Sequence, residues 1–467
     1  MMKTPSSSFT RREFTRTALL GTGALALPNI IPSRLLGAGA PSNKVRVGQI
    51  GCGRIAQTHD MPSVFHSDLA DYVAVCDFDS RRAADGKVLL EKWYREKNLP
   101  APKISVYGDY REMLARPDIE AVVISTPDHQ HAEAALRAIY AGKDVYLQKP
   151  MTMTHAEGVL LREAIVKSGR IFQLGSQQRS SVQFRRACEL VRSGRVGRLQ
   201  RVEIGLPIDP TAPDNPPAPV PANFDYQSWL GPTADVPYTE QRVHPQKGYD
   251  RPGWLRNDAY CLGMITGWGA HHYDIMQWAL DVELSGPGRI EAKADFPKNK
   301  IWNVHGAYHV ELTYRGDVRV AVSDKFPNGL KFIGDAGWIF VSRGSVATKD
   351  PGVKRGRLRP LDASDERLLD PKGVTVQLPV SKEHHENWLE CVRSRRTPMV
   401  PAPIAHRSNT ACIVSWIAMK LGRPLTWDPK AEQFVNDAGA NAMLKRPERA
   451  PFGATRLAMG KGAVGKV

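Results

Sequence analysis

The chain has 467 residues and a formal net charge of +16, from 64 lysines and arginines against 48 aspartates and glutamates. The length leaves room for two domains of ordinary size, and 42% hydrophobic residues with 39 glycines are typical of a globular α/β protein. The basic residues are spread out, without a basic–aromatic stripe or a nucleic-acid motif, so no nucleic-acid partner is expected. The six cysteines include no CxxC pair, which argues against a zinc site or a redox motif.

The N-terminal segment has the parts of an export signal. The sequence TRREFTR (residues 10–16) places paired arginines before an apolar stretch at residues 18–31 that is too short and glycine-rich to span a bilayer. We therefore expect residues 1–40 to be a twin-arginine signal peptide, the twin-arginine translocase to be a partner during export, and the mature protein to be periplasmic. No later run approaches the ~20 apolar residues of a membrane span, so no stable membrane insertion is expected.

Residues 44–176 alternate between apolar strand patterns and helical patterns. Strands are predicted at residues 45–50, 72–76, 119–125, 144–147 and 171–174, and helices at residues 55–64, 80–97, 131–141 and 154–168. This alternation with short connections predicts a Rossmann domain, a doubly wound parallel sheet with helices on both faces. Ligands of such sheets bind at the carboxyl ends of the strands.

A glycine-rich turn, GCGRIA (residues 51–56), follows the first predicted strand. Gly51 permits the tight turn, and Gly53 lets the backbone approach a pyrophosphate. Asp77 closes the second strand, near the spacing expected for an acid that binds ribose hydroxyls. This acid favours NAD as the cofactor, while Arg81 and Arg82 keep NADP open.

Residues 177–453 are predicted to form a second, α+β domain. Strands are predicted at residues 199–205, 288–295, 307–314, 318–322, 330–333 and 338–341, the last five antiparallel, and helices at residues 384–394 and 406–421. A buried helix is expected within residues 263–280. Residues 206–221 are proline-rich and predicted to be loop, residues 349–374 an irregular excursion, and residues 454–467 a flexible basic tail.

Three polar segments lie at predicted strand ends: STPDHQH (residues 125–131), QKP (residues 148–150) and GSQQR (residues 175–179). Through the glycine turn, the TPxxxH segment, the KP pair and the later GAHHYD (residues 269–274), the chain resembles the Gfo/Idh/MocA oxidoreductases, which include glucose–fructose oxidoreductase and inositol dehydrogenase. The resemblance spans nearly the whole mature chain and is closest to the exported branch with WLGP (residues 229–232). It implies a large open, mostly antiparallel sheet in the second domain and a homo-oligomer.

The resemblance and the chemistry together point to Lys149 and His271 as catalytic residues. A hydride-transferring alcohol site needs a base within ~2.6–3.2 Å of the hydroxyl proton. His271 matches the family's catalytic histidine through its HxxD continuation to Asp274, so we expect His271 as the base and Lys149 as its positioning or proton-sharing partner, with the order reversible. Gly267 replaces the aspartate of the family pattern four residues before the histidine, and Gln148 replaces the glutamate before the lysine.

The remaining candidates fall into two groups. The predicted cofactor-binding residues are Gly51, Gly53, Arg54, Ile55, Asp77, Arg81, Ser125, Thr126, Pro127, His131, Gln148 and Lys149. The predicted substrate-binding residues are Arg179, His244, Trp254, Tyr260, His272 and Asp274. No metal is predicted, because adjacent histidines on a helix point roughly 100° apart.

The expected function is NAD(P)-dependent hydride transfer to or from a carbohydrate or polyol hydroxyl. Export away from a free nucleotide pool implies a tightly bound cofactor that is recycled in place. An NAD-dependent glycosidase, epimerase or lyase that uses transient sugar oxidation and elimination stays open because of Gly267. A non-catalytic sugar-binding protein is the second alternative.

Overall fold

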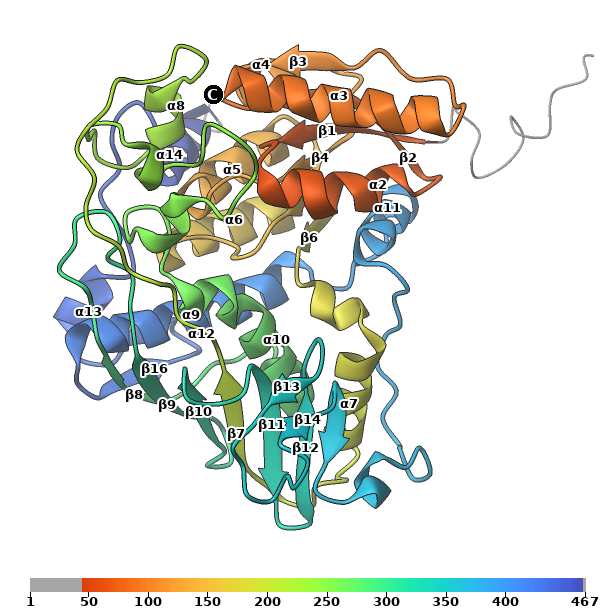
Figure 1. Ribbon diagram of the computed structural model, residues 1–467, viewed down its shortest axis with the longest axis vertical. Coiled ribbons are helices and arrows are strands. Elements are labelled where there is room, and N and C mark those ends of the chain that lie inside the picture. Colours follow the sequence, from red (N-terminus) through yellow and green to blue (C-terminus); the bar gives the residue numbers. More distant parts are fainter. Residues whose placement is uncertain (1–43, 465–467) are drawn as a thin grey trace, which may run out of the picture. The chain divides into compact units, whose positions relative to one another are not determined.

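The computed structural model describes residues 44–464, and the expected signal peptide at residues 1–40 lies outside this range. From β1 onward the chain builds a six-stranded sheet and then a nine-stranded sheet (Figure 1). Within the described residues, no helix is both long and apolar enough to cross a membrane. All six cysteines are buried free thiols.

The first sheet is parallel throughout, in the order β3-β2-β1-β4-β5-β6 of a dinucleotide-binding fold. Its strands are β1 (Val45–Ile50), β2 (Ala70–Cys76), β3 (Ser105–Tyr107), β4 (Ala121–Ile124), β5 (Asp144–Leu147) and β6 (Phe172–Leu174). Every residue of β4 and β5 is buried, as expected for strands covered on both faces. The predicted doubly wound Rossmann sheet is confirmed.

Helices alternate with these strands. They are α3 (Ser80–Glu96), α4 (Tyr110–Leu114), α5 (His131–Tyr140) and α6 (His155–Ser168). Thr154 and Glu157 form a reciprocal capping box that starts α6, and Gly169 ends it in the left-handed conformation at φ 63°. After β1, a π-helical turn, η3 (Ala56–Asp60), leads into α2 (Met61–Phe65) where one regular helix was predicted. The π turn carries Asp60, which is fully buried.

The second sheet has the order β15-β12-β11-β7-β10-β9-β8-β16-β17. Its strands are β7 (Leu199–Gly205), β8 (Arg289–Ala294), β9 (Tyr308–Thr313), β10 (Arg319–Ser323), β11 (Gly329–Gly334), β12 (Gly337–Val341), β15 (Leu361–Ala363), β16 (Leu425–Asp428) and β17 (Gln433–Phe434). The sheet is mostly antiparallel, as predicted, but β10 pairs with β7 in parallel. The edge strand β15 and the strand β14 (Arg357–Leu358) lie within residues 349–374, where an irregular excursion was predicted. Strand β14 forms a small hairpin with β13 (Val346–Ala347), which precedes that region.

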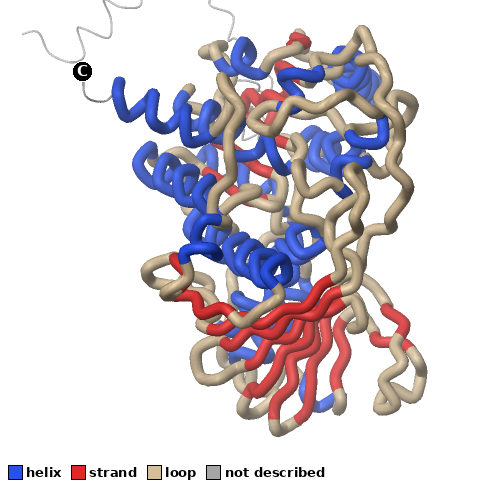
Figure 2. The backbone as a smooth tube through the Cα atoms, turned by 90° about the vertical axis from the view of Figure 1, so that its left-hand side faces the viewer, coloured by secondary structure: helices blue, strands red, loops and turns tan. Residues whose placement is uncertain are grey.

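One face of the second sheet is covered by α7 (Val182–Arg192), α10 (Gly269–Leu280) and α12 (Ala402–Leu421), and helices gather on one side of the strands in Figure 2. Burial alternates along β8, where Ile290 and Ala292 face the core while Arg289, Glu291 and Lys293 are exposed. The opposite face is therefore polar along β8, whereas at β12 it is covered, because Phe340 packs there in a buried cluster with Val353 and Leu358.

The last part of the chain returns to the first sheet. Helix α11 (His384–Ser394) buries Trp388 against Tyr146 of β5, with ring centroids 5.7 Å apart. Helix α14 (Ala454–Val464) packs on α5 and α6. The shorter elements are η4 (Asp128–Gln130), η5 (Gln177–Ser180), α8 (Tyr226–Leu230), η6 (Glu240–Arg242), η7 (Gly253–Arg256), α9 (Met264–Gly267), η8 (Glu366–Leu369) and α13 (Ala438–Ala442).

Candidate active site

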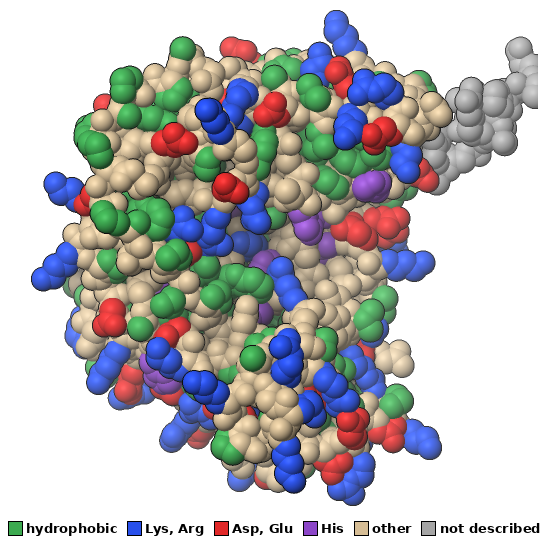
Figure 3. Space-filling view, in the orientation of Figure 1, with side chains coloured by type: hydrophobic (Ala, Val, Ile, Leu, Met, Phe, Trp, Pro, Cys, Tyr) green, Lys and Arg blue, Asp and Glu red, His purple; other side chains and the backbone are tan. Residues whose placement is uncertain are grey.

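A single cavity joins the carboxyl edge of the first sheet to loops from the second half of the chain. Its lining includes Gly51 and Asp77, after β1 and β2, and Lys149, after β5. Because β1 and β4 separate β2 from β5, and strands lie ~4.8 Å apart, the ends of β2 and β5, which precede Asp77 and Lys149, lie about 14 Å apart along this edge. That span suits an elongated ligand such as a dinucleotide. On the face drawn in Figure 3, Lys and Arg side chains gather around a central hollow.

The glycine turn has the geometry that a pyrophosphate needs. Gly51 has φ +84°, and a Cβ there would lie 2.8 Å from the Ser125 carbonyl oxygen, so only glycine fits. At Gly53 an added Cβ would meet only one flexible side-chain atom within 4 Å, which leaves the backbone open to the cavity. Arg54 and Ile55 also line the cavity, as the sequence predicted for cofactor-binding residues.

Asp77 is held at the end of β2 by two backbone groups. The Cys52 N–H donates to its Oδ2 at 2.8 Å, and the Asp79 N–H donates to its Oδ1 at 2.9 Å. Burial raises the pKa of the Asp77 carboxyl, and these two hydrogen bonds oppose the shift. The carboxylate lines the cavity and keeps further lone pairs for ribose hydroxyls, so the residues present fit NAD.

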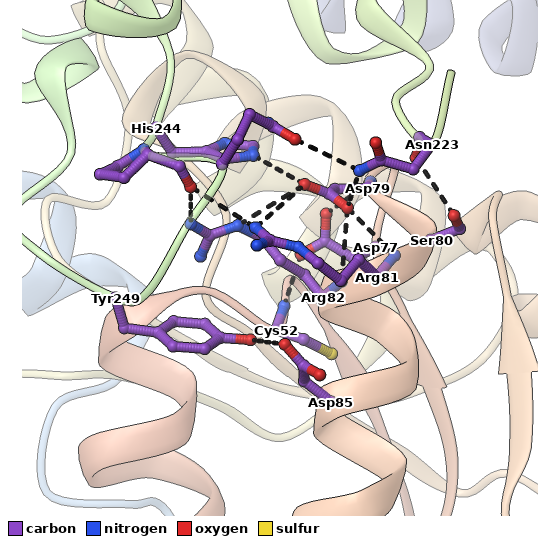
Figure 4. Close-up of polar contacts among 12 residues, drawn as sticks. Cys52, Asp77, Asp79, Ser80, Arg81, Arg82, Asp85, Asn223, His244 and Tyr249 are labelled. Carbon is purple, nitrogen blue, oxygen red and sulfur yellow. Dashed lines mark hydrogen bonds and ion pairs between the residues drawn. The ribbon is translucent and has the colours of Figure 1, made fainter. Parts of the chain in front are cut away.

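Asp79 anchors a polar cluster beside Asp77 (Figure 4). His244 Nε2 lies 3.0 Å from Asp79 Oδ2, and the Arg82 guanidinium donates to the Pro245 carbonyl at 3.0 Å. Burial raises the pKa of Asp79, but its hydrogen bonds, led by that from His244, outweigh burial and lower the pKa to about 2. His244, predicted to bind substrate, therefore lies at the Asp77 end of the cavity. Arg82 lines the cavity, whereas Arg81 is outside the described lining.

Residues 206–262, which we call the cover segment, contribute much of the remaining lining. The Tyr249 hydroxyl donates to Asp85 Oδ2 at 2.8 Å and accepts from Gln57 Nε2 at 2.7 Å. Phe224 forms an isolated β-bridge with Asp79. The cover segment is thus fastened to the Rossmann domain around the residues that would hold the adenosine half of NAD.

Lys149 lies at the other end of the site. Its Nζ donates to the Gly267 carbonyl at 2.8 Å. Burial lowers the pKa of Lys149, and the charge of Asp128, which also lines the cavity, opposes that shift. The predicted cofactor residues Ser125, Thr126, Pro127 and Gln148 all line the cavity. His131 lies behind them, with its ring nitrogens 3.0 Å from the Thr126 carbonyl and 2.6 Å from the Pro150 carbonyl.

Asp60 explains why glutamine stands at position 148. The buried Asp60 carboxylate accepts from Gln148 Nε2 and from the Ser125 hydroxyl, both at 2.7 Å, and lies 3.1 Å from His385 Nε2. Burial alone would lower the pKa of His385, but Asp60 and Glu383 raise it to about 9. A glutamate at position 148 would place a second carboxylate against Asp60, whereas an amide donates to it.

His271 is buried one turn after Gly267. It is 5% exposed and does not belong to the described cavity lining, and its Nδ1 has no hydrogen-bond partner among the described residues. Burial, followed by the charges of Arg343 and Lys149, lowers the pKa of His271 well below its ordinary value. The ring is therefore neutral and near enough to Lys149 to be influenced by its charge, but it is not among the residues that line the cavity.

Three other predicted substrate residues pair within the protein. Arg179 donates to both carboxylate oxygens of Asp274, at 2.7 and 2.8 Å, and to Glu283 at 2.6 Å. His272 Nε2 lies 2.9 Å from Asn328 Oδ1. Within the described chain none of Arg179, Asp274 and His272 lines the cavity.

Of the two aromatic candidates, one lines the cavity and the other packs within the protein. Trp254 lines the cavity, together with Trp229 and Trp268, which the sequence analysis did not select. Tyr260 packs against His129 and Trp229, with ring centroids 4.9 Å away in each case, and is not a described lining residue. Asp60, Asp128 and Arg251 were also missed. Only Asp128 had a signal, since it stands inside the quoted TPxxxH segment.

Two family models match the chain. One, described as an oxidoreductase family with an NAD-binding Rossmann fold, matches residues 45–176. The other, the C-terminal alpha/beta domain of the same oxidoreductase family, matches residues 212–345 and 366–454.

The chain is also similar to curated enzymes and solved structures. It is 34% identical over 155 residues to inositol 2-dehydrogenase of Pseudomonas savastanoi, covering 33% of this chain and 43% of that protein. It is 24% identical over 411 residues to scyllo-inositol 2-dehydrogenase (NAD(+)) of Bacillus subtilis, covering 83% and 98%. Several relatives are matched over less than half of their own length, 43 to 48%.

Among solved structures, the WlbA dehydrogenase of Bordetella pertussis, in complex with NADH and UDP-GlcNAcA, shares the fold at TM-score 0.58 and 16% identity, over 82% of this chain and 99% of that one. The aldose-aldose oxidoreductase of Caulobacter crescentus shares it at TM-score 0.57 and 17% identity, over 82% and 99%. With both of its halves matched by family models, and with a glycine turn and Asp77 arranged for NAD, the chain belongs to the Gfo/Idh/MocA oxidoreductase family.

Proposed function

We propose that this protein transfers a hydride between NAD and a hydroxyl-bearing carbon of a sugar or polyol. The observation that carries the proposal is the one cavity that includes both the Gly51–Asp77 cofactor features and Lys149. NAD, when bound, accepts or donates the hydride at its nicotinamide ring. Family members similar to this chain are named as inositol dehydrogenases, which supports a polyhydroxylated substrate.

Each end of the cavity suits its part of this reaction. Asp77 favours NAD over NADP, because a fixed carboxylate accepts from a ribose hydroxyl and repels a phosphate. At the other end, Lys149 would bind the hydroxyl that reacts, and Trp229, Trp254 and Trp268, which also line the cavity, would offer apolar ring faces to a sugar.

The cover segment supports a tightly held cofactor that is recycled in place. Its contacts through Phe224, His244 and Tyr249 close around the Asp77 end, so nucleotide release would require several of them to break. Retention accords with export to the periplasm by the twin-arginine pathway, which the proposal includes on the strength of residues 10–16. The proposal also includes a homo-oligomer that pairs through the face of the second sheet opposite its helices.

A second candidate is a glycosidase, epimerase or lyase that oxidises its sugar transiently. The observation that favours it is Gly267, whose carbonyl contacts Lys149 where the resemblance places an acid. Such an enzyme would return the hydride and yield no net oxidation. Product analysis separates the two: a keto sugar that accumulates with NADH indicates the oxidoreductase, whereas a cleaved or isomerised sugar with unchanged NAD indicates the second candidate.

Lys149→Ala tests the proposal. We expect the variant to retain bound nucleotide and to lose hydride transfer, measured as NADH formation in single-turnover mixtures with myo-inositol and D-glucose. Lys103→Ala, an exposed lysine outside the cavity, is the matched control. Unchanged turnover in Lys149→Ala would refute the assigned site.

A further inference from the structure

Asp128 is a buried acid that faces the cavity without a protein partner. It begins the turn η4 directly after the strand-end residues 125–127, is 6% exposed, and lines the cavity. Its carboxylate forms no ion pair or hydrogen bond with any other residue between positions 44 and 464. Burying an unpaired carboxylate is energetically unfavourable, and no contact with another residue compensates for the desolvation of Asp128.

Lys149 is the main charge that Asp128 faces. Burial raises the pKa of Asp128, and the positive charge of Lys149 opposes that rise. Burial lowers the pKa of Lys149, and the positive charges of Arg343 and Arg251 lower it further. The negative charge of Asp128 raises this pKa, and that of Asp60 raises it weakly. The two pKa values are thereby brought toward one another, which is the arrangement in which an acid and a base share a proton.

The neighbouring groups are less suited to accept a proton from substrate. Gly267 offers Lys149 only a backbone carbonyl. Asp60 is already bound by Gln148, Ser125 and His385, and His271 lies outside the described lining.

We propose, on the basis of the alcohol oxidation proposed above, that Asp128 accepts the hydroxyl proton while Lys149 donates a hydrogen bond to the same substrate oxygen. The C–H hydrogen leaves with its two electrons as hydride to NAD, the O–H proton moves to an Asp128 carboxylate oxygen, and the C=O bond forms. Reduction reverses each transfer. Asp128 thus takes over, from the end of β4, the role of the aspartate absent at position 267.

The first test measures the Lys149 amine directly and does not depend on turnover. Lys149 is labelled with an amine-reactive reagent from low to high pH, and its modification is followed by mass spectrometry. Asp128→Asn removes the negative charge that favours the ammonium, so the midpoint of labelling should move down by about one pH unit. Asp317→Asn makes the same chemical change at an exposed turn and should not move it. An unchanged midpoint in Asp128→Asn would overturn the coupling.

The second test is the pH profile of single-turnover NADH formation with myo-inositol and D-glucose. In the wild type, the rate should fall as pH drops through the pKa of Asp128. Asp128→Asn should slow oxidation by about 10²–10⁴-fold and lose this acid limb, with NAD affinity unchanged, and Asp128→Glu should restore part of the rate.

The outcomes separate the two proposals. Suppose that the wild type is active, and that the fall in rate at low pH persists in Asp128→Asn but disappears in His271→Asn. This result would overturn the role of Asp128 as proton acceptor and leave the proposed oxidoreductase activity intact. A wild type that binds NAD but oxidises neither probe, with the labelling shift present, would overturn the proposed oxidation, and the role of Asp128 as its proton acceptor with it.

Discussion

The buried pair of Asp60 and His385 should make the stability of this protein depend on pH. His385 is fully buried on α11, and its ring nitrogens face Asp60 on the π turn and Glu383 at the start of α11. Burial lowers its pKa, but the two carboxylates outweigh burial and raise it from the model-compound value of 6.5 to about 9. At ~1.4 kcal/mol per pKa unit, this rise corresponds to about 3 kcal/mol of stabilisation.

The direction of this pH dependence follows from the linkage between proton binding and folding. A raised pKa means that the folded protein holds the His385 proton more tightly than the unfolded chain does, so the stabilisation is complete below pH 6.5 and is lost as pH rises through 9. In Asp60→Asn most of this dependence of the free energy of unfolding on pH should disappear. The difference in free energy of unfolding between wild type and Asp60→Asn should therefore be smaller at pH 9.5 than at pH 6, by up to about 3 kcal/mol.

Urea denaturation at closely spaced pH values measures this difference. Asp317→Asn, at an exposed turn, is the control for the loss of one negative charge. If wild type and Asp60→Asn keep the same slope against pH from 6.5 to 9, the Asp60–His385 pair does not hold the charge assigned to it.

Three further predictions concern the cavity. Gln148→Glu places a carboxylate against Asp60, so one of the two must be protonated, at a cost of up to ~3–4 kcal/mol near neutral pH; thermal unfolding should show the loss, and adding Asp60→Asn should reverse it. Asp77→Asn should weaken NAD binding by about 10-fold or more while affecting NADP less, by titration calorimetry, and an equal loss for both would contradict the ribose assignment. Tyr249→Phe removes two hydrogen bonds of the cover segment and should speed nucleotide dissociation by about 10- to 30-fold in a competition assay; an unchanged rate would show that the segment does not retain the cofactor.

The regular, apolar elements could be predicted from the sequence. The strands β1, β5 and β7 and the helix α11 have the predicted bounds, because each has a clear hydrophobic pattern between turn residues. The short strands β3 and β15 were missed, since three residues carry no periodicity and depend on hydrogen bonds to a neighbouring strand. The π turn was missed because its pattern is that of a regular helix.

The site was predictable where the fold itself brings residues together. The carboxyl ends of parallel strands meet at one edge, so Gly51, Asp77 and Lys149 could be placed in one cavity from the sequence. The contacts of the cover segment could not, because a pair such as His244 and Asp79 is 165 residues apart with no pattern that links the two. Nor could the sequence show which residues of GAHHYD face inward, since all of α10 from Gly269 to Ala279 is buried.

The most direct test of the account is to purify the folded protein, denature it, and identify any released nucleotide by mass spectrometry. We predict NAD(H) in a stoichiometric amount, because we propose that Asp77 selects it and that the contacts of the cover segment retain it. An empty protein that also fails to bind added NAD or NADP would contradict the central claim that this cavity serves a nicotinamide cofactor.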